Sequence, residues 1–532
     1  MRRLALSASV VLAVGVGLVL LRPILLAPVT GDDVVNALEV AADPDRTIRT
    51  EITELPADWR YRYSIGRVNV LTAVERRVSN RAMVNTAVAT GRPVNQVLGT
   101  FKLGYAALSL FAVYALIRAI RWRRRDSGSL VQMEGRTRAI AMIAGGLGFA
   151  VGAQPQLSGP SGGGWLAYPV STWTAAFSIF GVVALTLWLA RLAAVRGWVV
   201  GVPAALLLGV IGVVSNYRYE LTFPALPLTL LALVLLPVSD REHRAAGLRA
   251  KWLLGSAYGV GFGVVFVANR MQISDVCAEG GCYSGVSLAL GSSMLRTFVI
   301  NVASSIPGTG REEVSALLRA ESLPTDGIWT PTLWSVLTAL VLVVTLALAW
   351  LGGGPRLNQA AGSEETRAQA VVCVMAAVLL TTGGLGAAAV MSLSERAQRF
   401  LPEIGLFYRH SVVTWLGLAF GAVLLVLALG LWRSRLALPS FVALALVLAI
   451  LTATRMPADG SIMEANSRRL KPSLEVFNEL VRGETGDRAN HRRCRILRLV
   501  DREAPPGYAP RIRLNAEKSY ERFWHVAFCH RG

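Results

Sequence analysis

The chain has 532 residues, of which 53% are hydrophobic and only 17% are charged, and its net charge is +20. Soluble domains carry about a quarter charged residues, so this composition excludes an ordinary soluble protein. In a soluble protein such a positive charge would suggest nucleic acid, but in a membrane protein it indicates basic cytoplasmic loops and contact with anionic membrane lipid. We therefore expect a membrane protein that binds no nucleic acid.

Apolar runs recur along the chain at the length that a bilayer requires. A hydrocarbon core of about 30 Å needs about 20 residues of helix, and spanning segments must satisfy every backbone hydrogen bond internally. The sequence predicts an all-α polytopic membrane protein with about eleven transmembrane helices. The first begins behind Arg2 and Arg3 and is expected to be a retained helix, because its apolar run exceeds that of a signal peptide and no convincing cleavage site follows. The expected spans are 4–27, 101–120, 137–153, 172–190, 198–214, 222–238, 252–268, 332–351, 370–391, 411–432 and 438–454.

Basic residues alternate with these spans in the way that short cytoplasmic loops require. With the N-terminus inside, the inner loops carry Arg121, Arg123, Arg124, Arg125, Arg191, Arg196, Arg241, Arg244, Arg249, Lys251, Arg433 and Arg435. The outer face then holds the long loops 28–100 and 269–331, the short loop 215–220 and the tail. We expect a transmembrane domain over 1–454 and an extracytoplasmic C-terminal tail over 455–532. Richness in Arg, Ala, Val and Gly is typical of high-GC bacteria, which predicts a bacterial inner (plasma) membrane.

The segment 287–306 is half apolar and contains Arg296 and Asn301. We expect an interfacial or re-entrant helix there. A twelfth span would move every later loop to the other side.

Four of the five cysteines fall on the predicted outer face: Cys277, Cys282, Cys494 and Cys529. Disulfides persist in oxidising compartments, so the even count predicts two bridges, one across the tight turn 277–282 and one within the tail. A zinc site with His491, His525 and His530 is the alternative, but the spacing matches no known zinc arrangement. We therefore predict no metal site.

Two outer segments show helical patterns. Hydrophobic residues recur at helical spacing within 59–81, which predicts an amphipathic helix on the membrane surface. In the tail, 473–481 has the same spacing, and Tyr520, Phe523, Trp524 and Phe528 are expected to pack back on the membrane face. The tail is too short and polar for an independent catalytic domain, so we expect it to cap the outer surface.

Asp32 and Asp33 follow the first span by only a few residues. Two adjacent carboxylates at a membrane surface are costly unless they are solvated, paired or used. One interpretation is a general base that takes a proton from an acceptor hydroxyl. The other is structural: Asp33 would cap a helix that begins near Val34, with Asp32 beside the positive helix end. The two roles are compatible.

This acidic pair in a long first outer loop, together with the layout of spans, second large loop and outer tail, resembles the GT-C superfamily of membrane glycosyltransferases. The resemblance implies a polyprenyl-phosphate-linked sugar as donor, an envelope glycan, lipid or protein as acceptor, and inversion of the anomeric centre. It implies Asp32 as catalytic base, with Asp33 assisting. No cofactor is specified, although a divalent cation is compatible with the resemblance.

The outer loop 215–220 offers a second group of candidates, Tyr217, Arg218, Tyr219 and Glu220. Sugar sites use aromatic faces for stacking, and carboxylate or Arg groups for hydroxyls and phosphate. By analogy with the superfamily, Glu220 would assist Asp32 or bind a metal. The structural alternative is an interfacial aromatic belt with a local ion pair.

The segment 395–410 supplies a third group, in which Arg396, Arg399, Arg409 and His410 would hold a lipid phosphate. Arginine suits phosphate because its planar fork donates two parallel hydrogen bonds. The alternative is an amphipathic connector with snorkelling arginines.

Two other functions fit the same sequence. A polysaccharide polymerase or ligase acting on lipid-linked glycans would show the same layout but would use outer Arg and His residues. A transporter would carry ionisable or helix-breaking residues at mid-membrane and repeated halves. The expected spans contain almost no ionisable residues and no repeat is visible, although 223–227 is interrupted by prolines.

Overall fold

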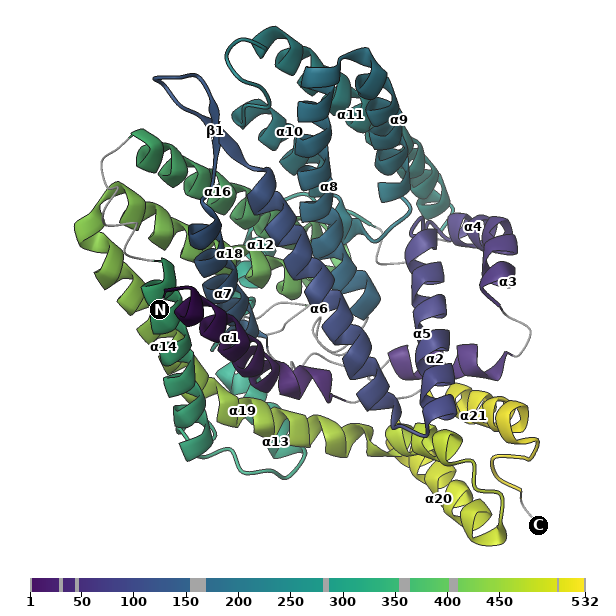
Figure 1. The fold of residues 1–532 in the computed structure, drawn as a ribbon. Coiled ribbons are helices and arrows are strands. Elements are labelled where there is room, and N and C mark those ends of the chain that lie inside the picture. The colour runs from purple at the N-terminus through teal and green to yellow at the C-terminus, as the bar shows by residue number, and fades with distance from the viewer. Residues whose placement is uncertain are drawn as a thin grey trace.

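The fold is built almost entirely from helices, nine of which are long and apolar enough to cross a membrane within the residues described (Figure 1). The protein is therefore a multi-pass helical membrane protein. The structure is a computed structural model, and it describes residues 2–27, 32–43, 47–153, 169–280, 287–353, 364–400, 410–504 and 507–530. The nine helices are α1 (Arg2–Leu25), α6 (Val94–Ala119), α8 (Pro169–Arg196), α9 (Trp198–Ser215), α11 (Arg244–Ala278), α14 (Leu333–Gly353), α16 (Glu364–Ser392), α18 (Ser411–Trp432) and α19 (Ser434–Arg482).

Two of the eleven expected spans do not give helices of this kind. The range 137–153 forms α7 (Gly135–Gly152), which has 18 residues and includes Arg136 and Arg138 in its first turn. The range 222–238 forms a short 3-10 helix, η1 (Glu220–Thr222), and α10 (Ala225–Leu235). With 11 residues, α10 is about 16 Å long, roughly half of the bilayer core.

Close helix contacts in the bundle depend on glycine, as is common when helices pack in a membrane. A Cβ atom built on Gly417 of α18 would collide with the carbonyl oxygen of Leu380 in α16. At the same crossing, the Thr414 hydroxyl donates to the carbonyl oxygen of Gly384 at 2.9 Å. The α16–α18 pair thus forms a tightly packed centre, against which α7 also packs.

Loops that the sequence assigns to the cytoplasm meet at one face, here called the inner face. A hairpin of β1 (Arg121–Arg123) and β2 (Leu130–Gln132) follows α6. The Arg123 guanidinium donates to the carbonyl oxygen of Ser239 at 2.7 Å, and the Leu130 amide donates to the Asp240 carboxylate at 2.9 Å. The Glu364 carboxylate accepts the amide of Arg125 at 2.6 Å. The first, third and fourth of these loops therefore lie side by side.

At the opposite, outer face the first loop and the tail fold together, and we call this unit the outer domain. Figure 1 shows α2 and α5 beside α20 and α21. The first loop contributes α2 (Asp32–Ala42), α3 (Ile48–Thr53), α4 (Leu55–Ser64) and α5 (Val70–Thr90), and the tail contributes the end of α19, α20 (Asp487–Glu503) and α21 (Ala509–Trp524). Their common core includes the buried residues Val35, Leu38, Val84, Phe477, Ile496 and Tyr520.

This arrangement changes two expectations. Tyr520 and Phe528 are fully buried in the core of the outer domain, so the tail aromatics pack on the first loop instead of the membrane face. The helix expected over 59–81 is interrupted between α4 and α5, where Gly66 has a φ of 70°, a value that glycine adopts readily. Because α5 packs on α2, α6 and α8, it belongs to the protein core on this side.

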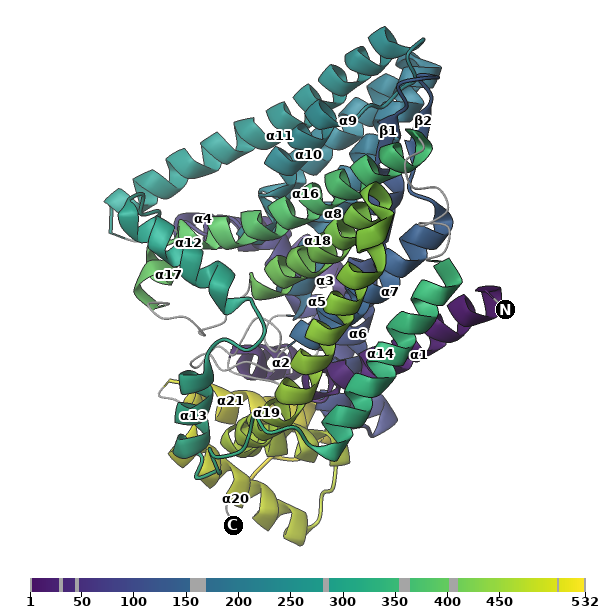
Figure 2. The same ribbon diagram turned by 90° about the vertical axis from the view of Figure 1, so that its left-hand side faces the viewer.

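The second outer loop contains two short helices, α12 (Ser292–Ser304) and α13 (Arg311–Ala320). With 13 residues, α12 is about 20 Å long, which is too short to span. It packs on α16, α17 (Glu395–Phe400) and α18, whereas α13 packs on α19 through a small core around Leu318 and Ile462 (Figure 2). Residues 287–306 therefore do not form a twelfth span.

Candidate substrate site at the outer face

The acidic pair lies at the start of α2, seven residues after the end of α1. The helix begins at Asp32, two residues earlier than expected, so by these bounds both aspartates belong to its first turn. The next two residues, Val34 and Val35, are buried in the core of the outer domain. The side chains of Asp32 and Asp33 lie outside the described part of the structure, but the burial of Val34 and Val35 fixes the backbone that carries them.

A buried lysine of α6 contacts the end of α1, the helix that precedes the acidic pair. Lys102 of α6 is fully buried, and its ammonium group donates to the carbonyl oxygen of Ile24 near the end of α1 at 3.1 Å. The Asn95 amide donates to the carbonyl oxygen of Leu26 at 3.3 Å. Our sequence reasoning missed Lys102, although an ionisable residue inside an expected span is itself a signal of function.

Loop 215–220 is held between the first-loop helices and the membrane bundle. The Leu71 amide donates to the carbonyl oxygen of Tyr217 at 2.9 Å, and the Tyr217 ring lies 4.3 Å from the Trp59 ring. Tyr63 donates from its hydroxyl to the Asn269 side chain of α11 at 3.1 Å. The aromatic residues of the loop and of α4 therefore gather at the outer ends of α9 and α11.

Arg218 points from this loop toward α5 and α8. Its guanidinium lies 3.0 Å from a carboxylate oxygen of Glu75 and donates to the hydroxyl of Thr174 at 3.3 Å and to that of Ser178. The side chain is 19% exposed, so its charge is largely shielded from water. The other two candidates in the loop are Tyr219, which is buried, and Glu220. Glu220 is the first residue of η1 and interacts electrostatically with Arg270 of α11.

Next to this ion pair, α4, α5 and the turn between them carry a group of arginines that we call the first-loop arginine cluster: Arg62, Arg67, Arg76 and Arg77. Burial, followed by the charges of the other three arginines, lowers the pKa of Arg62 to about 10, so the charge of Arg62 interacts with that of each of the other three. Arg77 is paired with Glu51 at 2.6 Å and with Asp58. The sequence showed the arginines but gave no sign that α4 would fold back to bring Arg62 against α5.

The third group of candidates lies on other helices, α17 and the start of α18. Arg399 is 74% exposed and paired with Glu395 one turn away, and Arg396 lies on the same short helix. His410 is fully buried, and its Nε2 donates to the carbonyl oxygen of Asn301 at 3.1 Å. Burial lowers the pKa of His410 to about 4, so the ring is neutral at pH 7. Arg409 lies outside the described residues.

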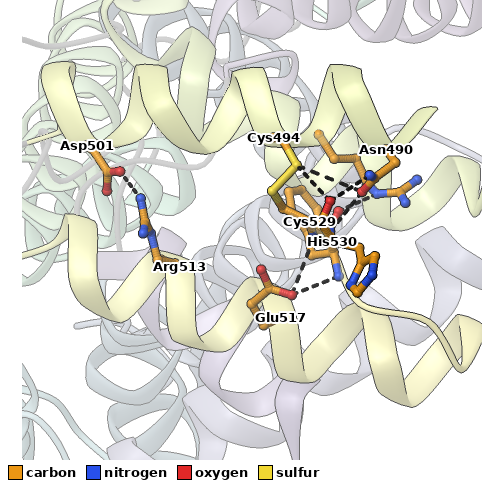
Figure 3. Close-up of a disulfide and its surroundings, with 9 residues drawn as sticks. Asn490, Cys494, Asp501, Arg513, Glu517, Cys529 and His530 are labelled. Carbon is orange, nitrogen blue, oxygen red and sulfur yellow. Dashed lines mark hydrogen bonds and ion pairs between the residues drawn. A yellow bond between two sulfur atoms is a disulfide. The ribbon is translucent and has the colours of Figure 1, made fainter. Parts of the chain in front are cut away.

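The tail contains the disulfide between Cys494 and Cys529, with Cα atoms 4.9 Å apart. It ties α20 to the segment that follows α21, where Glu517 accepts the amide of Phe528 at 2.8 Å (Figure 3). Cys277 is also disulfide-bonded, Cys282 lies outside the described residues, and Cys373 is a buried free thiol in α16. Among the described residues, no group of three or more His, Cys, Asp or Glu side chains is arranged to hold a metal ion.

Comparison with protein-family models, with curated proteins and with solved structures finds no match to this chain. The interpretation of its function therefore depends on the site residues themselves.

Proposed function

We propose that this protein is a membrane glycosyltransferase that moves a sugar from a polyprenyl-phosphate donor to an envelope glycan, lipid or protein on the outer side of the membrane. The observation that carries the proposal is the first-loop arginine cluster beside Arg218, at the outer ends of α9 and α11. Arginine binds phosphate through paired, charge-assisted hydrogen bonds. Trp59 and Tyr217 offer aromatic faces for a sugar in the same place.

The acidic pair supplies the second component of the reaction. The acceptor hydroxyl oxygen attacks the anomeric carbon, the bond from that carbon to the phosphate oxygen breaks, and polyprenyl phosphate leaves with the bonding electrons. The hydroxyl proton passes to the Asp32 carboxylate, which acts as general base. Arginines near the leaving phosphate stabilise the charge that develops on it. Both components lie along α5: its start carries Arg76, and about eight residues or 12 Å further on it packs on α2 at Val84. The donor must therefore move or extend from the cluster along α5 for its anomeric carbon to reach Asp32.

The first test addresses the base. We expect Asp32→Asn to lower sugar transfer by at least about a hundredfold, because a positioned general base contributes about that much. The control is Glu39→Gln on the same helix, since Glu39 is 56% exposed and pairs only at the surface with Arg511. Transfer is measured as envelope glycan composition and linkage in a deletion strain complemented with each variant, including Asp33→Asn. Loss of one sugar or linkage that wild type and Glu39→Gln restore, but Asp32→Asn does not, supports the transferase.

Other outcomes of this test point elsewhere. A change in glycan chain length alone, with both aspartate variants active, would favour the polymerase or ligase. An unchanged envelope in the deletion strain would favour a transporter.

The second test addresses the phosphate. Arg62→Gln is expected to raise the KM for the polyprenyl-phosphate sugar about tenfold or more, because it removes one charge-assisted contact. Arg60→Gln is the matched control, since Arg60 lies on the same helix but is exposed. Equal KM values for both variants would contradict a phosphate site at the cluster.

A further inference from the structure

A groove of about 950 Å³ runs along the membrane bundle between α6, α8 and α9. Its walls are mostly apolar and include Phe111, Phe177, Trp188 and Val210. On α8 the lining extends from Ser178 near the outer face to Arg191 near the inner face, a separation of thirteen residues or about 20 Å. This length exceeds one leaflet of a hydrocarbon core about 30 Å thick.

The inner end of the groove is strongly basic. Arg118 of α6, Arg121 of β1 and Arg191 of α8 all line it. No ion pair involving any of the three is found among the described residues. Arg191 donates to the carbonyl oxygen of Ala119, but the Nε atoms of Arg191 and Arg121 are buried without a hydrogen-bond partner in the described structure.

Three carboxylates on the same face, Asp126, Asp240 and Glu364, contact other groups. Asp126 pairs with Arg124 at 2.7 Å, Asp240 accepts the Leu130 amide, and Glu364 accepts two hairpin amides. Arginines at the membrane boundary that lack a carboxylate partner require another anion or water.

We propose that the groove binds an anionic phospholipid from the inner leaflet. Its phosphate lies at Arg118, Arg121 and Arg191, and an acyl chain lies along the apolar walls toward Ser178. The argument is charge complementarity at one end combined with an apolar channel of membrane depth. Arg218, which pairs with Glu75 in the outer-face site, also lines the outer end of the groove. The proposed phosphate position at Arg191 lies at the other end, about 20 Å along α8 from Ser178.

Simple snorkelling of arginines to the interface is the competing explanation, and it predicts no selection among lipids. The test is native mass spectrometry of the full chain in detergent, titrated with phosphatidylglycerol or with phosphatidylcholine of the same acyl chains. We expect phosphatidylglycerol to bind at least about tenfold more tightly. Equal binding of the two lipids would overturn the proposal.

Two sets of variants locate the site. Arg121→Gln with Arg191→Gln should remove the preference for phosphatidylglycerol, whereas Arg433→Gln with Arg435→Gln should retain it, because these exposed arginines lie on the same face but outside the groove. An unchanged preference in the first double variant would overturn the proposal.

A further variant tests the acyl chain and does not touch the charges. Gly181 lines the groove, and a Cβ there meets neighbours only at 4.0 Å, so Gly181→Leu should fit and fill the channel. We expect it to weaken phosphatidylglycerol binding about tenfold. If the arginine double variant does not fold, this measurement still tests whether the groove binds the lipid. Unchanged binding by Gly181→Leu would contradict the proposal. Full displacement of the lipid by millimolar inorganic phosphate would also contradict it, because the site would then bind phosphate without binding an acyl chain.

Discussion

The outer domain and the inner-face loops are both rich in arginine, but they use it differently. In the outer domain Arg493 is 2% exposed, lies over the Tyr520 ring at 4.5 Å, and donates to the Tyr520 hydroxyl and to the carbonyl oxygens of Phe528 and Glu484. On the inner face Arg124 pairs with Asp126 in an exposed hairpin. The three arginines of the groove, Arg118, Arg121 and Arg191, have no carboxylate partner among the described residues.

This difference shows that the role of an arginine depends on what surrounds its guanidinium. A buried guanidinium that donates to backbone carbonyls stabilises the fold, because its removal leaves those carbonyls buried without a hydrogen-bond donor. An exposed pair is screened by water and contributes little. A guanidinium at the membrane boundary without a carboxylate partner can bind an anionic ligand. The predictions that follow test the first two of these cases, and the groove experiments test the third.

The largest effect is expected from Arg493→Met. The substitution keeps much of the volume but leaves the carbonyls of Phe528 and Glu484 without a donor, so the outer domain should lose about 3 kcal/mol or more. Hydrogen exchange of α20 and α21 in the full chain measures the loss as faster opening. Arg495→Met, an exposed neighbour on the same helix, is the control. Equal exchange in the two variants would show that the buried arginine is not structural.

Removal of the tail disulfide should rank next. Cys494 and Cys529 are 35 residues apart, and closing a loop of this length stabilises a fold by about 3–4 kcal/mol in the chain-entropy model. The double variant Cys494→Ala/Cys529→Ala should therefore make the tail sensitive to limited proteolysis. Dithiothreitol should sensitise the wild-type tail in the same way but have no further effect on the tail of the variant. A tail that resists the protease in both forms would contradict the prediction.

Much of the membrane bundle could be predicted because apolar runs of bilayer length have few alternatives to helix. Two expected spans, α7 and α10, are not long and apolar enough to cross a membrane, and the reasons are local. α7 has two arginines in its first turn, and α10 is shortened by Pro224 at its start. The partners of the tail could not be predicted, since a surface such as that of Tyr520 fits either lipid or another helix. Only the three-dimensional fold decides between them.

The candidate site was predicted less completely. The acidic pair and Arg218 are candidates because of their residue types and their position next to expected spans. The partner of Arg218, Glu75, is 143 residues away in the chain, and no local pattern connects them. Lys102 is visible in the sequence as an ionisable residue in an expected span, but nothing in the local pattern shows that it contacts the end of α1.

The Arg218–Glu75 pair is intermediate between the buried and the exposed case, because its side chains are 19% and 35% exposed. We expect a coupling free energy of about 1 kcal/mol between Arg218→Gln and Glu75→Gln in a double-mutant cycle of thermal unfolding. A coupling near zero would mean that Ser178 and Thr174, rather than Glu75, hold the guanidinium.

The smallest effect is expected at the inner hairpin, from Asp126→Asn. The Arg124 guanidinium lowers the pKa of Asp126, so any contribution of the pair is present above about pH 4 and is lost as the pH falls through the lowered pKa. Because both side chains are exposed to solvent, water and salt screen this contribution, and the asparagine still accepts the amide of Ser127. The melting temperature at pH 7 should therefore change by less than about 1 °C. A larger fall, which 0.5 M salt reproduces in the wild type, would show that the hairpin depends on the pair and that the inner face is held more like the outer domain than its exposure suggests.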